Sequence, residues 1–67
     1  MASEKYYAVV RGKHIGIFSS WGKCAKLVLG YPKAKYKSFY DFEDAQDYIY
    51  DERGIWVGQD EIDKEIF

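Results

Sequence analysis

Runs of apolar residues near the N-terminus predict a β-hairpin. Residues 6–10 (YYAVV) are aromatic or β-branched apart from one alanine, a composition typical of strands. Residues 11–13 (RGK) supply a glycine-centred turn, and residues 14–18 (HIGIF) form a second strand. Gly16 has no side chain to pack, which indicates a bulge or the close approach of another backbone.

Apolar residues at helical spacing follow the hairpin and predict a helix over residues 21–29. Four of them form one stripe: Trp21, Cys24, Leu27 and Val28. Ser19 or Ser20 can cap this helix by accepting hydrogen bonds from its free amides. Gly30 ends the helix in a left-handed conformation, and Pro32 prevents its continuation.

A third strand and a second helix complete the predicted order. The strand runs from about Ala34 to Phe39, and Asp41 then caps a helix that ends at Gly54. This helix has one acidic face and one apolar face, formed by Phe42, Ala45, Tyr48 and Ile49. The pattern therefore predicts an α+β domain over residues 1–54, with a small three-stranded antiparallel sheet and two helices in the order β-β-α-β-α.

Residues 55–67 (IWVGQDEIDKEIF) form a C-terminal extension for which several structures are open. Residues 55–57 could add an edge strand or fold back on the core. Asp60 could cap a short helix that carries Ile62, Ile66 and Phe67 on one side. Alternatively, the segment binds a partner or begins a linker.

Length and composition indicate a single folded domain inside the cell. The 67 residues are 48% hydrophobic and 31% charged, which excludes a disordered tail. One cysteine, Cys24, cannot form an intrachain disulfide and fits a reducing compartment. No apolar run approaches a membrane span, and the polar start MASEK does not resemble a signal peptide. We expect a cytoplasmic location, or a nuclear one in a eukaryote.

Charge is distributed very unevenly along the chain. Residues 1–40 carry eight basic side chains against one acid, a net charge of +7, whereas residues 41–67 carry ten acids against two basic side chains, a net charge of −8. This asymmetry favours a polyanion-binding surface on the first part, with the acids facing elsewhere. The alternative is that the two parts neutralise each other within the monomer.

The segment over residues 30–40 (GYPKAKYKSFY) points to nucleic acid as the polyanion. It interleaves three lysines with four aromatic residues, a combination that holds a charged backbone while rings pack on sugars or bases. The sequence does not favour metal binding or nucleophilic catalysis. His14 is the only histidine, and Cys24 suits a helical core. The acids between Asp41 and Asp63 could suggest a metal-dependent nuclease, but a solvated helix face explains them better.

Several short fragments together resemble a known family. In order and spacing, they are residues 6–9 (YYAV), 11–12 (RG), 16–18 (GIF), Trp21, Cys24, 30–32 (GYP) and 34–39 (AKYKSF). Over roughly residues 5–50, the chain resembles the hybrid-binding domain at the N-terminus of type 1 ribonuclease H, which is shared with the caulimoviral viroplasmin family. The resemblance implies a β-β-α-β-α module that binds RNA/DNA hybrids, and double-stranded RNA more weakly, without reading sequence.

The resemblance also implies roles for particular residues. Trp21 and Tyr36 would pack against the sugar-phosphate backbone of the DNA strand, and Lys37 would hold a DNA phosphate. The backbone of residues 32–35 would contact RNA 2′-hydroxyls. Two positions depart from the family: Ser38 stands where a second lysine is common, and Tyr36 stands where phenylalanine is common.

The predicted binding residues combine the two lines of reasoning. They are Trp21, Tyr36, Lys37, Ser38, Lys35, Lys33, Ala34, Tyr7, Arg11 and Lys13, with no catalytic residue, metal or cofactor. Strict alternation along a strand would place Tyr36 and Lys37 on opposite faces of the sheet. The helical stripe also allows Trp21 to be a core residue instead of a binding residue. Any nuclease activity would belong to a separate domain fused to this one or to a recruited partner. The alternative function is a protein-interaction or dimerisation module that uses the acidic C-terminal part.

Overall fold

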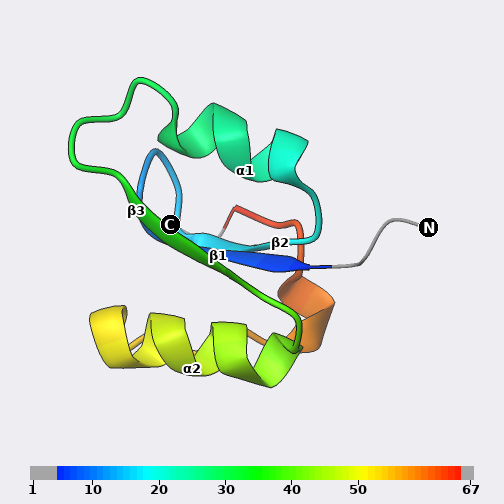
Figure 1. The fold of residues 1–67 in the computed structure, drawn as a ribbon. Helices are drawn as coiled ribbons and strands as arrows, with labels where there is room; N and C mark the ends of the chain where they lie inside the picture. Colours follow the sequence, from blue (N-terminus) through cyan, green and yellow to red (C-terminus); the bar gives the residue numbers. More distant parts are fainter. Residues whose placement is uncertain (1–4, 66–67) are drawn as a thin grey trace.

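A computed structural model describes residues 5–65 of the chain. Its elements are β1 (Tyr6–Arg11), β2 (Gly16–Phe18), α1 (Trp21–Val28), β3 (Lys35–Phe39), α2 (Phe42–Arg53) and a 3₁₀ turn, η1 (Gln59–Glu61). The strands form an antiparallel sheet in the order β2-β1-β3. The two helices cover opposite faces of this sheet (Figure 1). The predicted α+β fold with the order β-β-α-β-α is confirmed.

Local signals start and end both helices. The Ser20 hydroxyl accepts a hydrogen bond from the Lys23 backbone N–H at 3.4 Å, so Ser20 is the cap of α1. Gly30 adopts a φ of 77° just beyond this helix, which ends one residue earlier than expected. Asp41 is the N-cap residue of α2 without a side-chain hydrogen bond, and Gly54, with a φ of 68°, ends α2.

The alternation of β1 divides the core into two clusters, one under each helix. The α2-side cluster contains Ala8, Val10, Ile15, Ile17, Ala45, Ile49 and Val57. The α1-side cluster contains Val9, Phe18, Cys24, Leu27 and Val28. Each large buried side chain stabilises the fold by about 1.5–3 kcal/mol. Phe39 and Phe42 are half-buried and pack against the α2-side cluster.

The hairpin turn contacts α1 closely, and this explains a glycine in the turn. The Lys13 backbone N–H donates to the Leu27 carbonyl at 2.9 Å. A Cβ at Gly12 would lie 2.8 Å from that same carbonyl oxygen and 3.0 Å from a Val9 methyl group. Any side chain at position 12 would therefore push the turn away from α1.

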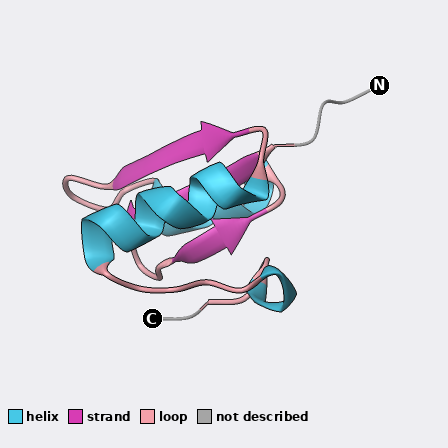
Figure 2. Ribbon diagram, turned by 90° about the horizontal axis from the view of Figure 1, so that it is seen from below, coloured by secondary structure: helices cyan, strands magenta, loops and turns pink. Residues whose placement is uncertain are grey.

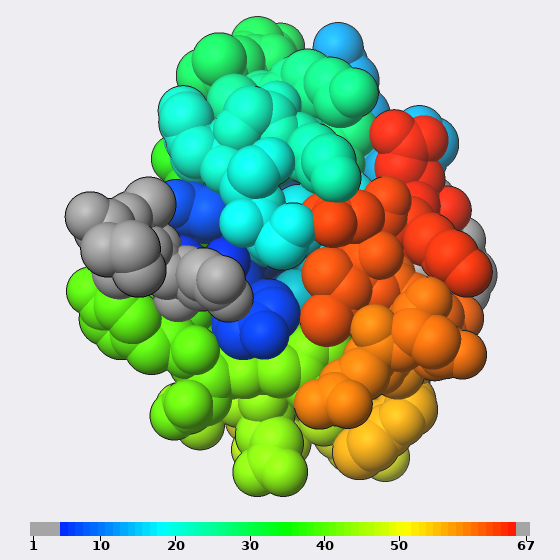
Figure 3. Space-filling view, turned by 90° about the vertical axis from the view of Figure 1, so that its right-hand side faces the viewer, coloured from blue at the N-terminus to red at the C-terminus, as the bar shows by residue number. Residues whose placement is uncertain are grey.

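The segment after α2 folds back on the domain and adds no strand. Val57 has no exposed surface and belongs to the α2-side cluster. The Asp63 backbone N–H donates to the Ile17 carbonyl at 2.8 Å, so the segment also lies along β2. There the Lys64 carbonyl oxygen would be 2.8 Å from a Cβ at Gly16, which accounts for a glycine in that strand. Figure 2 shows this return path beyond α2, and Figure 3 shows the segment, in orange and red, against both helical layers.

The expected C-terminal helix differs from the structure. Gly58, not Asp60, precedes η1, and the Gly58 N–H donates to Glu61 Oε1 at 3.0 Å. Ile62 packs against the α2-side cluster, whereas Ile66 and Phe67 lie outside the described residues. Within residues 5–65, no helix is long and apolar enough to cross a membrane.

Candidate nucleic-acid interface

Three aromatic residues, two exposed and one half-buried, form a cluster on the α1 side of the sheet. Tyr36 pairs with Val9, whose side chain faces α1, and Trp21 is the first residue of α1. The Trp21 and Tyr36 ring centroids lie 5.6 Å apart, and those of Trp21 and Tyr7 lie 5.9 Å apart. Trp21 is 43% exposed and Tyr36 is 41% exposed, so Trp21 lies at the edge of the core and not within it. We call Tyr7, Trp21 and Tyr36 the aromatic cluster.

The lysines of β3 lie on the other face of the strand. Lys37 pairs with Ala8, a member of the α2-side cluster, and its Nζ lies 5.5 Å from the centroid of the Phe39 ring. Ser38 pairs with Tyr7 and shares the face of Tyr36. Alternation therefore separates Lys37 from the aromatic cluster. Because β3 is an edge strand, both of its faces border the same open edge of the sheet.

Lys35 is already engaged in an ion pair. Its Nζ lies 2.9 Å from Oε1 of Glu52 on α2. The hydrogen bond to Glu52 and the charge of that carboxylate raise the pKa of Lys35 above its ordinary value. Of the predicted binding lysines, Lys35 is therefore the one whose charge is already paired with an acid within the described residues.

The remaining predicted residues gather at one end of the sheet. Arg11 pairs with Lys35 after a register shift between Val9 and Arg11, so the hairpin turn lies beside the loop that connects α1 to β3. Arg11, Lys13 and Lys33 are exposed and have no ion pair within residues 5–65. Ala34 is half-buried and packs against the α1-side cluster, which leaves its backbone to line this loop. We call Arg11, Lys13 and Lys33 the basic loops.

Neutralisation between the two parts of the chain is limited to a few pairs. Besides Lys35–Glu52, the described residues contain Lys23–Asp63 at 3.1 Å and His14–Glu65 at 3.4 Å. Each pair joins a residue before position 41 to one after it. The charge asymmetry thus persists at the basic loops, which have no acid paired with them in the described structure.

Asp63 holds the chain that leads into α1, a role that sequence patterns did not indicate. Its carboxylate accepts hydrogen bonds from the Ser19 N–H at 2.8 Å and from the Ser19 hydroxyl at 2.7 Å, besides its ion pair with Lys23. Partial burial alone would raise the pKa of Asp63. The hydrogen bonds from Ser19 and Lys23, with the charge of Lys23, outweigh burial and lower it below its ordinary value. No local signal could reveal a contact that spans 44 positions.

The described residues gather no set of metal ligands, and their one cysteine is buried. No group of three or more His, Cys, Asp or Glu side chains within residues 5–65 is placed to hold a metal ion. Cys24 is fully buried, and burial raises the pKa of its thiol to about 11. A buried, protonated thiol is a weak nucleophile.

A small sheet between two helices carries exposed rings and basic loops, a combination that favours binding to a nucleic-acid backbone. The family comparison agrees, since residues 5–49 match the ribonuclease H1 N-terminal domain. The chain therefore belongs to this family, as its short motifs predicted.

Curated relatives show the same similarity. The chain is 44% identical over 43 residues to a ribonuclease H of Schizosaccharomyces pombe, a match covering 64% of this chain and 16% of that protein. It is 39% identical over 44 residues to a ribonuclease H of Saccharomyces cerevisiae, a match covering 66% of this chain and 13% of that protein. It is 36% identical over 44 residues to ribonuclease H1 of Mus musculus, a match covering 66% of this chain and 15% of that protein. The match thus spans about a sixth or less of each relative.

Proposed function

We propose that this chain binds RNA/DNA hybrids, and double-stranded RNA more weakly, without sequence specificity. The observation that carries this proposal is the aromatic cluster, whose rings Trp21 and Tyr36 are exposed on the α1 side of the sheet. The hairpin turn also contacts α1, and the basic loops have no acid paired with them within residues 5–65. Rings beside free cations favour binding to a nucleic-acid backbone, because cations attract phosphates while rings pack on sugars.

Each strand of the hybrid would meet a different part of this surface. Trp21 and Tyr36 would pack on sugars of the DNA strand, where no 2′-hydroxyl interferes. The backbone of the loop before β3, including Ala34, would contact 2′-hydroxyls of the RNA strand. Arg11, Lys13 and Lys33 would neutralise phosphates.

Lys37 and Ser38 would hold one DNA phosphate together across the open edge of β3. They start from opposite faces of this strand, so the phosphate would sit at the edge and not above a face. The Ser38 hydroxyl would donate a hydrogen bond where relatives of this family often place a second lysine. This arrangement makes a weaker phosphate site than two lysines would.

The biological role we propose is tethering. The relatives are named as ribonucleases H and are much longer than the matched region. A hybrid-binding module would raise the concentration of a fused or recruited nuclease at its substrate. The residues of this chain would contribute binding, and the partner would contribute catalysis.

The test is an anisotropy titration against RNA/DNA hybrid, duplex RNA and duplex DNA of one sequence and length, each at two salt concentrations. We expect the tightest binding to hybrid, then to RNA, and the weakest to DNA. Trp21→Ala and Tyr36→Ala should each weaken hybrid binding by at least about fivefold, because stacking contributes about 1–3 kcal/mol per ring. Tyr50→Ala removes a somewhat more exposed ring on α2 and should leave affinity unchanged.

The phosphate site has its own pair of variants. Lys37→Ala should weaken binding and make the negative slope of log binding constant against log salt concentration shallower by about one. Lys64→Ala should do neither. Ser38→Lys should strengthen binding and steepen that slope by about one. Equal affinity for all three duplexes, or unchanged affinity in both Trp21→Ala and Lys37→Ala, would refute the proposed site.

A further inference from the structure

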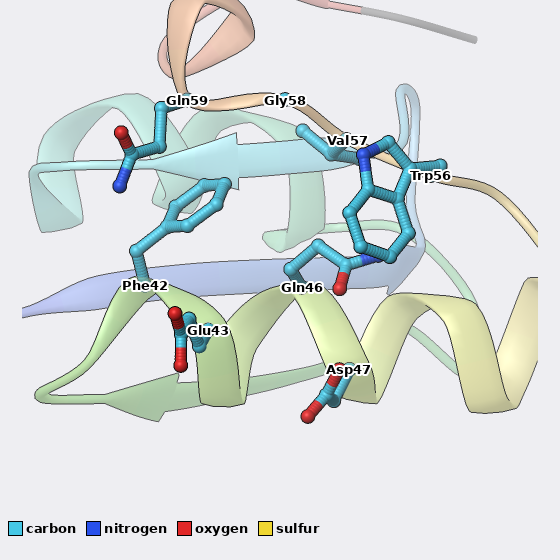
Figure 4. A pocket seen from close by; sticks show the side chains of 8 residues that line it. All are labelled: Phe42, Glu43, Gln46, Asp47, Trp56, Val57, Gly58 and Gln59. Atoms are coloured by element: carbon cyan, nitrogen blue, oxygen red, sulfur yellow. The ribbon is translucent and has the colours of Figure 1, made fainter.

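A groove lies on the side of the molecule remote from the aromatic cluster, between α2 and the returning C-terminal segment. It has a volume of about 400 Å³. Figure 4 shows Phe42 and Gln46 reaching from α2 toward the segment that carries Trp56 and Gln59. Glu43 and Asp47 lie along α2 at the rim of the groove. No basic side chain lines it, so it differs in charge from the hybrid-binding surface proposed above.

The carboxylates at this groove are unneutralised. Glu43 and Asp47 are exposed and have no ion pair within residues 5–65. In the same acidic part of the chain, only Glu52, Asp63 and Glu65 are paired with basic residues within residues 5–65, so Glu43 and Asp47 share their unpaired state with other acids of this part. The groove is thus a place where negative charge is left available, which excludes a nucleic-acid strand and favours a cation.

A buried amide at the groove lacks a hydrogen-bond partner. Gln46 is 3% exposed, and its Nε2 has no partner among the described residues. In Figure 4, its amide extends from α2 toward the side of the groove formed by Trp56. An unsatisfied buried N–H is unfavourable, so an incoming acceptor such as a peptide carbonyl would be stabilised there.

Trp56 supplies an exposed ring beside these polar groups. It is 69% exposed, and its described ring contact is an edge-on one with Tyr50 at 6.3 Å between centroids. A weakly held indole can rotate to admit a ligand carbonyl to Gln46, and its face attracts cations. Tryptophan is also enriched at the centres of protein interfaces.

We propose that this groove binds an arginine-bearing segment of a partner polypeptide. The guanidinium stacks on Trp56 and donates to the carboxylates of Asp47 and Glu43, and a main-chain carbonyl of the segment accepts from Gln46 Nε2. Arginine fits better than lysine, because its planar group can stack and form two hydrogen bonds at once. The groove and the aromatic cluster lie on opposite sides of the sheet, so a peptide and a hybrid can be bound together.

The test uses the full 67-residue chain, labelled with ¹⁵N, and a synthetic peptide of alternating arginine and serine. We expect shifts of the Trp56 indole and Gln46 side-chain signals, with the Trp21 indole unaffected. The matching lysine–serine peptide should bind at least about threefold more weakly. Bound hybrid should leave the peptide affinity within about twofold.

Matched variants separate a defined site from general attraction. Asp47→Asn should weaken peptide binding by about threefold to tenfold, and Trp56→Ala by about tenfold. Asp51→Asn removes the same charge one turn further along α2, outside the groove, and should change affinity by less than about twofold. Neither aspartate variant should weaken hybrid binding.

Several results would overturn the proposal. Equal effects of Asp47→Asn and Asp51→Asn would show that the peptide responds only to net charge. Absence of binding at millimolar peptide, or shifts centred on Trp21 and Tyr36, would remove the site. Groove signals that move with protein concentration in the absence of peptide would assign the groove to a second copy of this chain instead.

Discussion

The C-terminal segment should contribute measurably to stability through one valine. Val57 has no exposed surface and packs in the α2-side cluster, although it lies beyond the region shared with the family. Val57→Ala removes two methyl groups, each worth about 0.8 kcal/mol of burial, and leaves a small cavity that adds to the loss. We expect the free energy of unfolding to fall by about 2–3 kcal/mol. A domain of this size has only about 3–10 kcal/mol in total.

Urea denaturation followed by far-ultraviolet circular dichroism measures this loss directly. The midpoint should fall with little change in slope, and the melting temperature should fall by about 10–20 °C. Gln59→Ala changes an exposed position of the same segment and should stay within about 0.5 kcal/mol of the wild type. A loss below about 0.5 kcal/mol for Val57→Ala would show that the segment does not pack on the core in solution.

Three further predictions concern ionisable groups. Because the pKa of Asp63 is lowered in the folded state, its contribution to stability is complete above its unfolded pKa and disappears on acidification. Asp63→Asn should therefore be less stable than the wild type at pH 6 by about 1 kcal/mol, as measured by urea denaturation. This difference in unfolding free energy should shrink below about pH 4, and a difference that stays constant with pH would contradict the prediction. The buried Cys24 thiol, with a pKa of about 11, should react with Ellman's reagent at pH 8 only after unfolding; rapid labelling of the folded chain would disprove its burial. Glu52→Gln releases Lys35 and should strengthen hybrid binding at low salt by about twofold to fivefold, more than Asp51→Asn does; equal gains would mean that Lys35 takes no part.

Local patterns were sufficient to predict the elements of this fold. The strands β1 and β3, both helices and their ends follow from runs of β-branched and aromatic residues, helical spacing, serine and aspartate caps, and glycines that accept a positive φ. These signals act over a few residues, so each can be interpreted without knowing the rest of the structure. Motif spacing was also sufficient to place the chain in its family.

The candidate site was predicted in composition but not in arrangement. The sequence showed rings and lysines alternating along β3, yet it could not show that Tyr36 meets Trp21 while Lys35 turns away to Glu52. Which face of a strand meets which helix depends on how the sheet is assembled. The helical stripe likewise could not decide between core and surface for Trp21, because that depends on where α1 lies relative to the sheet edge.

The sequence by itself determined the order of the three strands and two helices, the fold class and the uneven distribution of charge. Only the tertiary structure decided that Val57 fills the core, that Asp63 holds Ser19, and that Glu43 and Asp47 remain unpaired beside a groove. The physical reason is how far apart in the sequence the interacting residues lie. Propensity and capping depend on neighbours in the chain, whereas burial and ion pairing depend on residues that only folding brings together.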